Sequence, residues 1–274
     1  MFILDSACVT SASKRTKTRA RFYAPVLDCF IRTTGGEKKM GTCENLGTMV
    51  VIGKNASTKE ALVFCPRCKL WSCDYCAELN KDYWIHQATR GSILLVAEGA
   101  TLQFITLTSR PYATPASSLY FFSQNWPKLR KRASDQTKAW EPFTGIKWSY
   151  FLVPERHKTG VLHVHLIAAT HLEGAKWWHD NAYKSGFGYQ TKVEPIIDPA
   201  GASHYISKYL HKGAGKEDWP KGFRRVRHSQ NWPVTKEKPL EGWDWITVGE
   251  GQVWQEKEAL IDMGFNVRDN RNIK

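Results

Sequence analysis

Two histidines, His163 and His165, interrupt the apolar run VLHVHLIAA at residues 161–169. The run is typical of a buried strand, because its other members are apolar, most of them aliphatic. Side chains alternate between the two faces of a strand, so both imidazoles lie on one face. Two imidazoles side by side on a stiff element suit a divalent metal ion. The alternative is a pair that faces solvent or satisfies hydrogen bonds in the core, and the pair alone favours this alternative.

A carboxylate is expected beside these histidines. Glu155 ends the preceding predicted strand, IKWSYFLVP at residues 146–154, and the turn HKTG at residues 157–160 brings the chain back antiparallel. One carboxylate and two imidazoles on adjacent strands would bind Mn²⁺ or Mg²⁺ and leave positions open for phosphate oxygens. His157 shares the face of Glu155 and is a weaker candidate ligand. Without the histidines, Glu155 would be read as a solvated charge.

Two tyrosines, Tyr205 and Tyr209, lie on one face of a helix predicted over residues 199–211, because they are four residues apart. Such pairs are usually core aromatics. Here, however, Lys208 and Lys212 each follow a tyrosine by three residues. Ionising a phenol of pKa ~10 at neutral pH costs roughly 4 kcal/mol. A nearby ammonium and a metal-bound phosphate would offset that cost, so the pair is also a candidate for nucleophilic catalysis.

Four of the seven cysteines occur in two CxxC pairs separated by four residues: Cys65, Cys68, Cys73 and Cys76. Four thiolates can close a tetrahedral zinc site, and such a site is structural because it leaves no position open for catalysis. An iron–sulfur cluster, or thiols that bind no metal, are the alternatives. Cys8, Cys29 and Cys43 lack this spacing and are expected to be small buried residues.

The composition favours a nucleic-acid partner. The chain has 39 Lys and Arg against 26 Asp and Glu, a formal net charge of +13, with 12 Trp, 10 Tyr and 12 Phe. Such a surface attracts polyanions, and the aromatics favour nucleic acid over a membrane. Candidate DNA contacts are residues 11–21, 128–132 and 223–227, each of which could equally be a solvated face.

A cytoplasmic protein with no membrane partner is expected. The sequence has no apolar run of about 18 residues. Its first residues place basic side chains after a short apolar start, which is the wrong order for a secretory signal. Cysteines in metal-binding spacing also favour a reducing compartment.

The elements that must position these side chains follow in an order of mixed strands and helices. Strands are predicted at 49–52, 61–64, 102–108, 146–154, 161–169 and 189–196, the last at a sheet edge, and helices at 77–87 (with a possible continuation to 99), 117–132, 172–184 and 199–211. This order predicts an α+β fold, with an antiparallel sheet and helices packed on one side of it. No elements are predicted for the tail that follows residue 214.

Three segments resemble, in their order, the motifs of rolling-circle replication initiators of the HUH endonuclease superfamily, as found in small plasmids and single-stranded DNA phages. They are FITLTSR at 104–110, HVHLI at 163–167 and HYISKYLHK at 204–212. The resemblance covers roughly residues 102–213. It implies an HUH endonuclease core with a central antiparallel sheet of about five strands at residues 91–213. An N-terminal region with a four-cysteine zinc module at 1–90 and an extension of unknown role at 214–274 would flank this core.

The resemblance also implies roles for the candidate residues. His163 and His165 would be ligands of a catalytic Mn²⁺ or Mg²⁺, with Glu155 as the third ligand. Tyr205 and Tyr209 would attack a DNA phosphate, giving a 5′-phosphotyrosyl intermediate and a 3′-OH that primes synthesis, and would later rejoin the strand.

Lysines and threonines would support this chemistry. Lys208 and Lys212 would act beside the nucleophiles, and Thr106 and Thr108, from the first motif, would lie beneath the metal.

The implied partner is single-stranded or origin DNA in the cytoplasm of a host cell. A host helicase and polymerase would also be needed, because the sequence contains no GxxxxGK[ST] loop. One alternative is a rolling-circle transposase of the same superfamily. The other is a zinc-containing DNA-binding regulator without enzymatic activity, in which the tyrosines belong to the core and the histidines are incidental.

Overall fold

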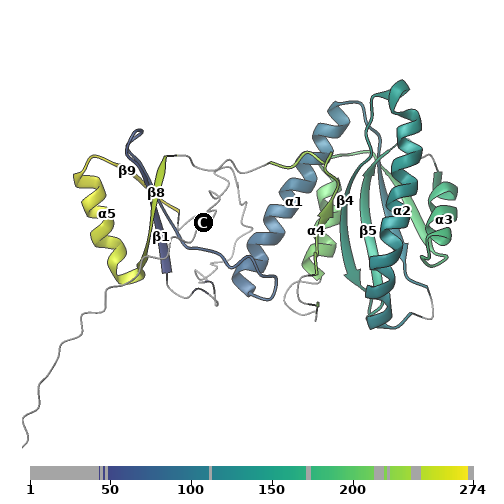
Figure 1. The fold of residues 1–274 in the computed structure, drawn as a ribbon, viewed down its shortest axis with the longest axis horizontal. Coiled ribbons are helices and arrows are strands. Elements are labelled where there is room, and N and C mark those ends of the chain that lie inside the picture. Colours follow the sequence, from purple (N-terminus) through teal and green to yellow (C-terminus); the bar gives the residue numbers. More distant parts are fainter. Residues whose placement is uncertain are drawn as a thin grey trace, which may run out of the picture.

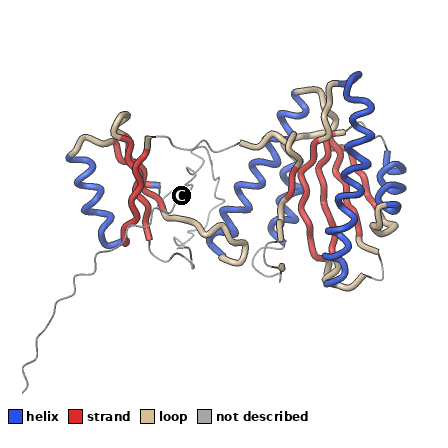
Figure 2. Tube along the Cα trace, in the orientation of Figure 1, coloured by secondary structure: helices blue, strands red, loops and turns tan. Residues whose placement is uncertain are grey.

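The computed structural model describes Cys43, Leu46 and residues 49–110, 113–170, 174–212, 219–220, 223–235 and 242–270; for residues 202–204 and 211–212 it describes the backbone alone. These residues form two sheets, one of five strands in the order β6-β3-β5-β4-β7 and one of four strands in the order β8-β1-β2-β9. Figure 1 and Figure 2 show both sheets and the helices around them.

The five-stranded sheet is antiparallel throughout. Its strands are β3 (Leu102–Thr108), β4 (Ser149–Arg156), β5 (Leu162–Ala169), β6 (Thr191–Ile196) and β7 (Arg227–His228). The prediction of an α+β fold with a central antiparallel sheet is therefore confirmed. The strand expected at 189–196 lies at an edge, as its alternating pattern indicated, whereas the histidine strand β5 is central.

Helices cover both faces of this sheet, so the prediction of helices on one side is wrong. Helices α1 (Asp74–Ala97) and α4 (Ala202–Lys212) lie on one face, and α2 (Pro115–Thr144) and α3 (Gly174–Lys184) lie on the other. The physical reason is that the central strands are buried on both faces. Six of the eight residues of β4 and seven of the eight of β5 are buried, which leaves no face for solvent.

Each face has its own core. Ile105 and Leu166 pack against α2 and α3 in a cluster that includes Trp126, Leu129 and Trp178. Their neighbours in sequence point the other way, so Phe104 and Ile167 join α1 and α4 in a cluster that includes Leu95, Ile206 and Leu210. The alternation of the strands thus divides one apolar sequence between two cores.

Helix α2 extends twelve residues past the predicted end at residue 132. Thr114 caps its start by accepting a hydrogen bond from the backbone N–H of Ser117, and Pro115 occupies the first turn, where proline is tolerated. Pro127 lies inside the helix and does not end it. Of the helices that the structure describes, none is both long and apolar enough to span a lipid bilayer.

The four-stranded sheet joins segments from the two ends of the described chain. The predicted hairpin forms β1 (Met49–Asn55) and β2 (Glu60–Phe64), and β8 (Trp243–Gly249) and β9 (Asn266–Asp269) flank it. A short 3-10 helix (Glu250–Gln252) and α5 (Val253–Asp262) connect β8 to β9. A small core between α5 and the sheet contains Val50, Ile52, Val63 and Leu260.

These pairings cross the predicted divisions of the chain. Helix α1 continues through residue 90, strand β7 follows residue 213, and the four-stranded sheet combines strands from both regions that were expected to flank the core. The residues after 214, for which no elements were predicted, supply β7, β8, α5 and β9.

Candidate active site and metal centre

The β4–β5 hairpin places Glu155 directly opposite His163. Strand β3 lies on the other side of β5, with Thr106 opposite His165 and Thr108 opposite His163. Directly paired residues of antiparallel strands share a face, so these five side chains gather on the face covered by α1 and α4. The predicted proximity of the carboxylate to the two imidazoles follows from this register.

His165 is held on every side. The side chain is buried, and its Nε2 lies 2.8 Å from Oε2 of Glu155. An ionised carboxylate only accepts hydrogen bonds, so Nε2 donates, and Nδ1 accepts from the hydroxyl of Thr106 at 3.2 Å. The ring of Tyr209 stacks on the imidazole with centroids 3.4 Å apart, and Phe104 stacks at 5.9 Å.

His163 is half-buried and stacks on His157, with ring centroids 4.8 Å apart. Burial lowers the pKa of His163 below its ordinary value of 6.5, the positive charges of His157 and His165 lower it further, and Glu155 opposes the shift. The imidazole is therefore neutral at pH 7, which is the form that binds a metal ion.

The histidine and carboxylate atoms only partly converge. Among the described residues, the cysteine cluster below is the one set of three or more His, Cys, Asp or Glu ligand atoms that all lie within 4.8 Å of one another. The 2.8 Å between Glu155 Oε2 and His165 Nε2 is close to the ~3 Å between neighbouring ligands in an octahedral Mg²⁺ site. These two atoms fit a hard divalent cation, whereas His163 would have to turn from His157 to join them.

Helix α4 carries both candidate nucleophiles over β3. Ile206 and Leu210 are fully buried in the core, and this fixes the rotation of the helix. Tyr205 and Tyr209 then lie against Phe104, with ring centroids 5.1 Å and 5.9 Å away. Tyr205 is 48% exposed, whereas Tyr209 is half-buried on the imidazole of His165.

A cavity of about 280 Å³ opens beside the two tyrosines. Its walls are Phe104, Thr106, Lys192, Glu194, Tyr205, Lys208 and Tyr209. The ammonium of Lys208 lies 5.9 Å from the ring centroid of Tyr209. The cavity therefore combines two phenol hydroxyls with two ammonium groups, next to the imidazole–carboxylate pair.

The sequence analysis missed Lys192 and Glu194. They form an ion pair at 2.8 Å on edge strand β6. The hydrogen bond from Glu194 raises the pKa of Lys192, and the phenols of Tyr209 and Tyr205 add to that rise. The signal that could have found them is the register of β6 on β3, which sets Lys192 opposite Thr106 and Glu194 opposite Phe104.

Three further candidates differ in how the structure places them. The hydroxyl of Thr108 donates to the carbonyl of Gln190 at 2.8 Å and so differs from that of Thr106, which bonds to His165. His157 is exposed. Lys212 lies in the last turn of α4, and its side chain is outside the described residues.

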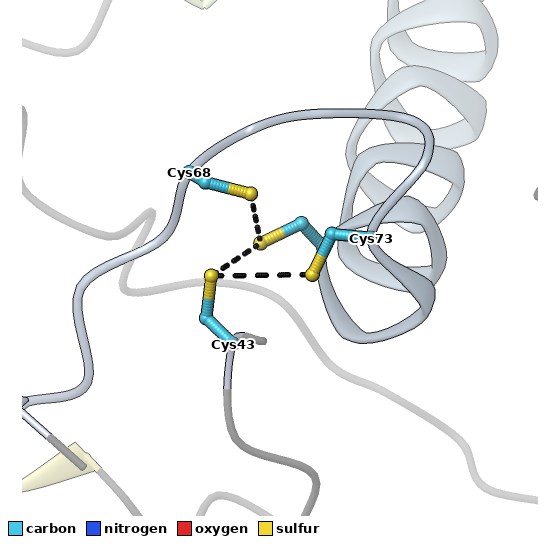
Figure 3. Close-up of side chains that lie close together, drawn as sticks. Cys43, Cys68 and Cys73 are labelled. Carbon is cyan, nitrogen blue, oxygen red and sulfur yellow. Dashed lines mark hydrogen bonds between the residues drawn. The ribbon is translucent and has the colours of Figure 1, made fainter. Parts of the chain in front are cut away.

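A second candidate metal centre consists of Cys43, Cys68, Cys73 and Cys76, whose sulfur atoms all lie within 4.8 Å of one another. The Sγ atom of Cys76 lies 3.5 Å from that of Cys68 and 3.7 Å from that of Cys43 (Figure 3). Zn–S bonds of about 2.3 Å in a tetrahedron place sulfur atoms about 3.8 Å apart. The cluster is thus compatible with a structural zinc ion.

One member of this cluster differs from the prediction. Cys43 stands where Cys65 was expected, and Cys65 is not among the four clustered thiols. Cys43 is buried, as expected, but it comes from a segment 30 residues before Cys73. The spacing argument considered only cysteines close together in sequence, so it could not detect a ligand that the fold brings from before β1.

Comparison with known proteins supports a replication initiator. Residues 102–214 match a protein-family model described as a replication-associated protein of the ORF2 type. The matched segment is less than half of the 274 residues and runs from β3 to just past α4. It includes every candidate histidine, tyrosine and lysine described above. No curated protein and no solved structure matches the chain.

Proposed function

We propose that this protein initiates replication by nicking one strand of origin DNA with a tyrosine of α4. The observation that carries the proposal is the stacking of Tyr209 on His165, with ring centroids 3.4 Å apart, while His165 bonds to Glu155 at 2.8 Å. A candidate nucleophile and a candidate metal seat therefore form one site. The family match over residues 102–214 supports the same conclusion.

The proposed step is a transesterification that balances without a co-reactant. The phenol oxygen of Tyr205 or Tyr209 forms a bond to the phosphorus, the bond from phosphorus to the 3′ oxygen breaks, and the phenol proton is balanced by the proton gained by the 3′-OH. The reverse reaction rejoins the strand. With two tyrosines, one can cleave and the other can later close the circle.

His163, His165 and Glu155 would hold the catalytic Mn²⁺ or Mg²⁺, which would polarise the scissile phosphate as a Lewis acid. Thr106 orients His165 by its hydrogen bond to Nδ1. Lys208 and Lys192 place positive charge at the cavity where the phenolate and the phosphate meet.

We further propose that Cys43, Cys68, Cys73 and Cys76 bind a structural zinc ion. The spacing of their sulfur atoms supports this assignment. The ion would tie the segment before β1 to the first turn of α1, where Cys76 lies and which Cys73 caps.

Single-stranded or origin DNA is the proposed substrate, and the formal net charge of +13 supports binding to a polyanion. Unwinding and synthesis are assigned to a helicase and a polymerase of the host, and the protein would act in the host cytoplasm.

The test uses single-stranded fragments of the protein's own replicon origin, labelled at the 3′ end, with Mn²⁺ or Mg²⁺. We expect a labelled covalent adduct with the protein, and we expect the Tyr205→Phe/Tyr209→Phe double variant to form none. The control is Tyr120→Phe/Tyr183→Phe, which removes two exposed hydroxyls from α2 and α3 on the opposite face of the sheet. An adduct formed by the first double variant would refute the nucleophile assignment. Absence of an adduct with wild-type protein on every origin fragment would favour a non-enzymatic regulator.

A further inference from the structure

A second cavity, of about 590 Å³, lies at the β7 edge of the five-stranded sheet. Its walls come from α1, α2, β4, the loop before α1 and residues 223–228. It shares no wall residue with the cavity beside the tyrosines. Its volume lies within the range of ordinary small-molecule sites, roughly 300–1,000 Å³.

Flat aromatic side chains form much of the wall: Trp71, Trp84, Trp126, Tyr150 and Phe223. Their orientations are fixed by neighbouring rings. Trp126 meets Tyr150 edge to face at 5.0 Å, and Trp84 lies 5.8 Å from the ring of His228. Rigid aromatic surfaces of this kind stack well on nucleobases, because every base has a π-face.

The remaining wall is strongly basic. It contains Arg130, Arg224, Arg225, Arg227 and His228, and none of the described residues that line the cavity is acidic. The charges are positioned by aromatic rings: the guanidinium of Arg225 lies 4.8 Å from the ring centroid of Trp71, and that of Arg227 lies 4.9 Å from that of Phe122. The arginines are thus pre-oriented for a planar, bidentate anion such as phosphate.

Burial makes this charge costly in the absence of an anion. Arg225 is 3% exposed. Burial lowers the pKa of Arg227, and its Nε is buried without a hydrogen-bond partner among the described residues. A buried cation destabilises a fold unless an anion or a hydrogen bond compensates it. A phosphate in the cavity would supply both.

We propose that this cavity binds one nucleotide of a single DNA strand, with the base against the tryptophans and the phosphate against the arginines. The site lies apart from the tyrosine chemistry and does not depend on it. It would hold the strand at the β7 edge while another part of the strand reaches α4.

The test removes two exposed arginines of the wall in the full chain, Arg130→Gln and Arg224→Gln. The matched control, Lys128→Gln/Arg132→Gln, removes the same net charge from exposed positions of the same helix α2 that do not line the cavity. Both are made in the Tyr205→Phe/Tyr209→Phe background and measured without metal, so that binding is separated from cleavage.

Fluorescence anisotropy with a labelled oligothymidylate reports the affinity. We expect the cavity variant to weaken binding by about tenfold or more beyond the control, because two charge-assisted contacts to phosphate are lost. Equal losses in the two variants would overturn the proposal, since they would indicate only long-range attraction. A Trp71→Leu variant tests the base: it should weaken binding of the oligothymidylate but not of an abasic strand of equal length. Equal weakening of both strands, in a variant that unfolds like wild type, would also overturn it.

Competition distinguishes a strand from a free nucleotide. Thymidine monophosphate in excess should displace the oligonucleotide far less well than a short unlabelled strand does, and competition by inorganic phosphate as strong as that by thymidine monophosphate would contradict a base-binding cavity. Failure of this proposal leaves adduct formation by wild-type protein intact, so the two proposals fail separately.

Discussion

At the scale of single residues, the chemistry depends on how firmly His165 is oriented. Its two ring nitrogens bond to Glu155 and Thr106, and its faces stack on aromatic rings. The Thr106 hydroxyl can both donate and accept. It can therefore support Nδ1 while Nε2 donates to Glu155, and also after Nε2 has given up its proton to bind a metal ion.

This arrangement predicts the effect of Thr106→Val. The valine keeps the branched shape but cannot accept from Nδ1–H, so Mn²⁺ affinity should fall about 10- to 100-fold, as is usual when the hydrogen-bond partner of a ligating histidine is lost. Isothermal titration calorimetry measures the affinity. Thr108→Val is the control, because the Thr108 hydroxyl bonds to the carbonyl of Gln190 instead. Equal losses in both variants would contradict a specific role for Thr106.

Lys192 should assist ionisation of the tyrosines. The phenols raise the pKa of Lys192, and by reciprocity its positive charge lowers theirs. Lys192→Gln should therefore shift the pH profile of adduct formation to higher pH and lower the rate at pH 7 by up to about tenfold, the equivalent of one pKa unit. Lys176→Gln is the control, since Lys176 also pairs with a carboxylate of its own element but lies on α3. An unmoved profile would exclude Lys192 from this role.

Which of these residues the sequence could reveal depends on how local their signal is. The histidines, Glu155 and the tyrosines repeat with the period of one strand, one hairpin or one helix, so their shared faces were predictable. Lys192 and Glu194 reach the site only because β6 pairs with β3 in a particular register. Register between distant strands is set by the packing of the whole sheet, which a local pattern does not encode.

At the scale of elements, the sheet was easier to predict than its coverings. A strand buried on both faces and a strand buried on one face can have similar apolar runs, so the second layer of helices escaped prediction. The position of α1 on the sheet depends on Gly91. A Cβ there would lie 2.2 Å from Nε1 of Trp232, which is 1% exposed and donates to the carbonyl of Gln87.

Gly91→Ala should therefore destabilise the protein, although alanine is the better helix former. Displacing the buried indole should lower the free energy of unfolding by about 1–3 kcal/mol, the usual cost of overpacking a core. Urea unfolding followed by tryptophan fluorescence measures the change. Gly251→Ala is the control, because a Cβ at that position meets no atom within 4 Å. Unchanged or increased stability in Gly91→Ala would contradict this packing.

At the scale of the whole molecule, the chain returns to its own beginning. Strand β1 pairs with β8, and β2 pairs with β9, so residues after 242 complete a sheet that starts at residue 49. The tail could not be assigned from sequence because its strands are short and half-exposed, and their partners lie about as far away as the chain allows. The same long-range closure brings Cys43 to the thiols at the start of α1.

The two cysteines Cys43 and Cys65 offer a direct test of this closure. Cys43→Ser should lose zinc, because a structural site stabilised by about 10–16 kcal/mol loses roughly a quarter of that with one ligand, or about 100-fold in affinity. Cys65→Ser should keep it, since Cys65 is not among the clustered thiols. Zinc content after dialysis, together with the thiolate-to-metal absorption of a Co²⁺-substituted sample, measures both. The unfolding temperature of Cys43→Ser should drop to that of wild-type protein treated with a chelator. Retention of zinc by Cys43→Ser and its loss by Cys65→Ser would restore the ligand set that the paired CxxC spacing predicts.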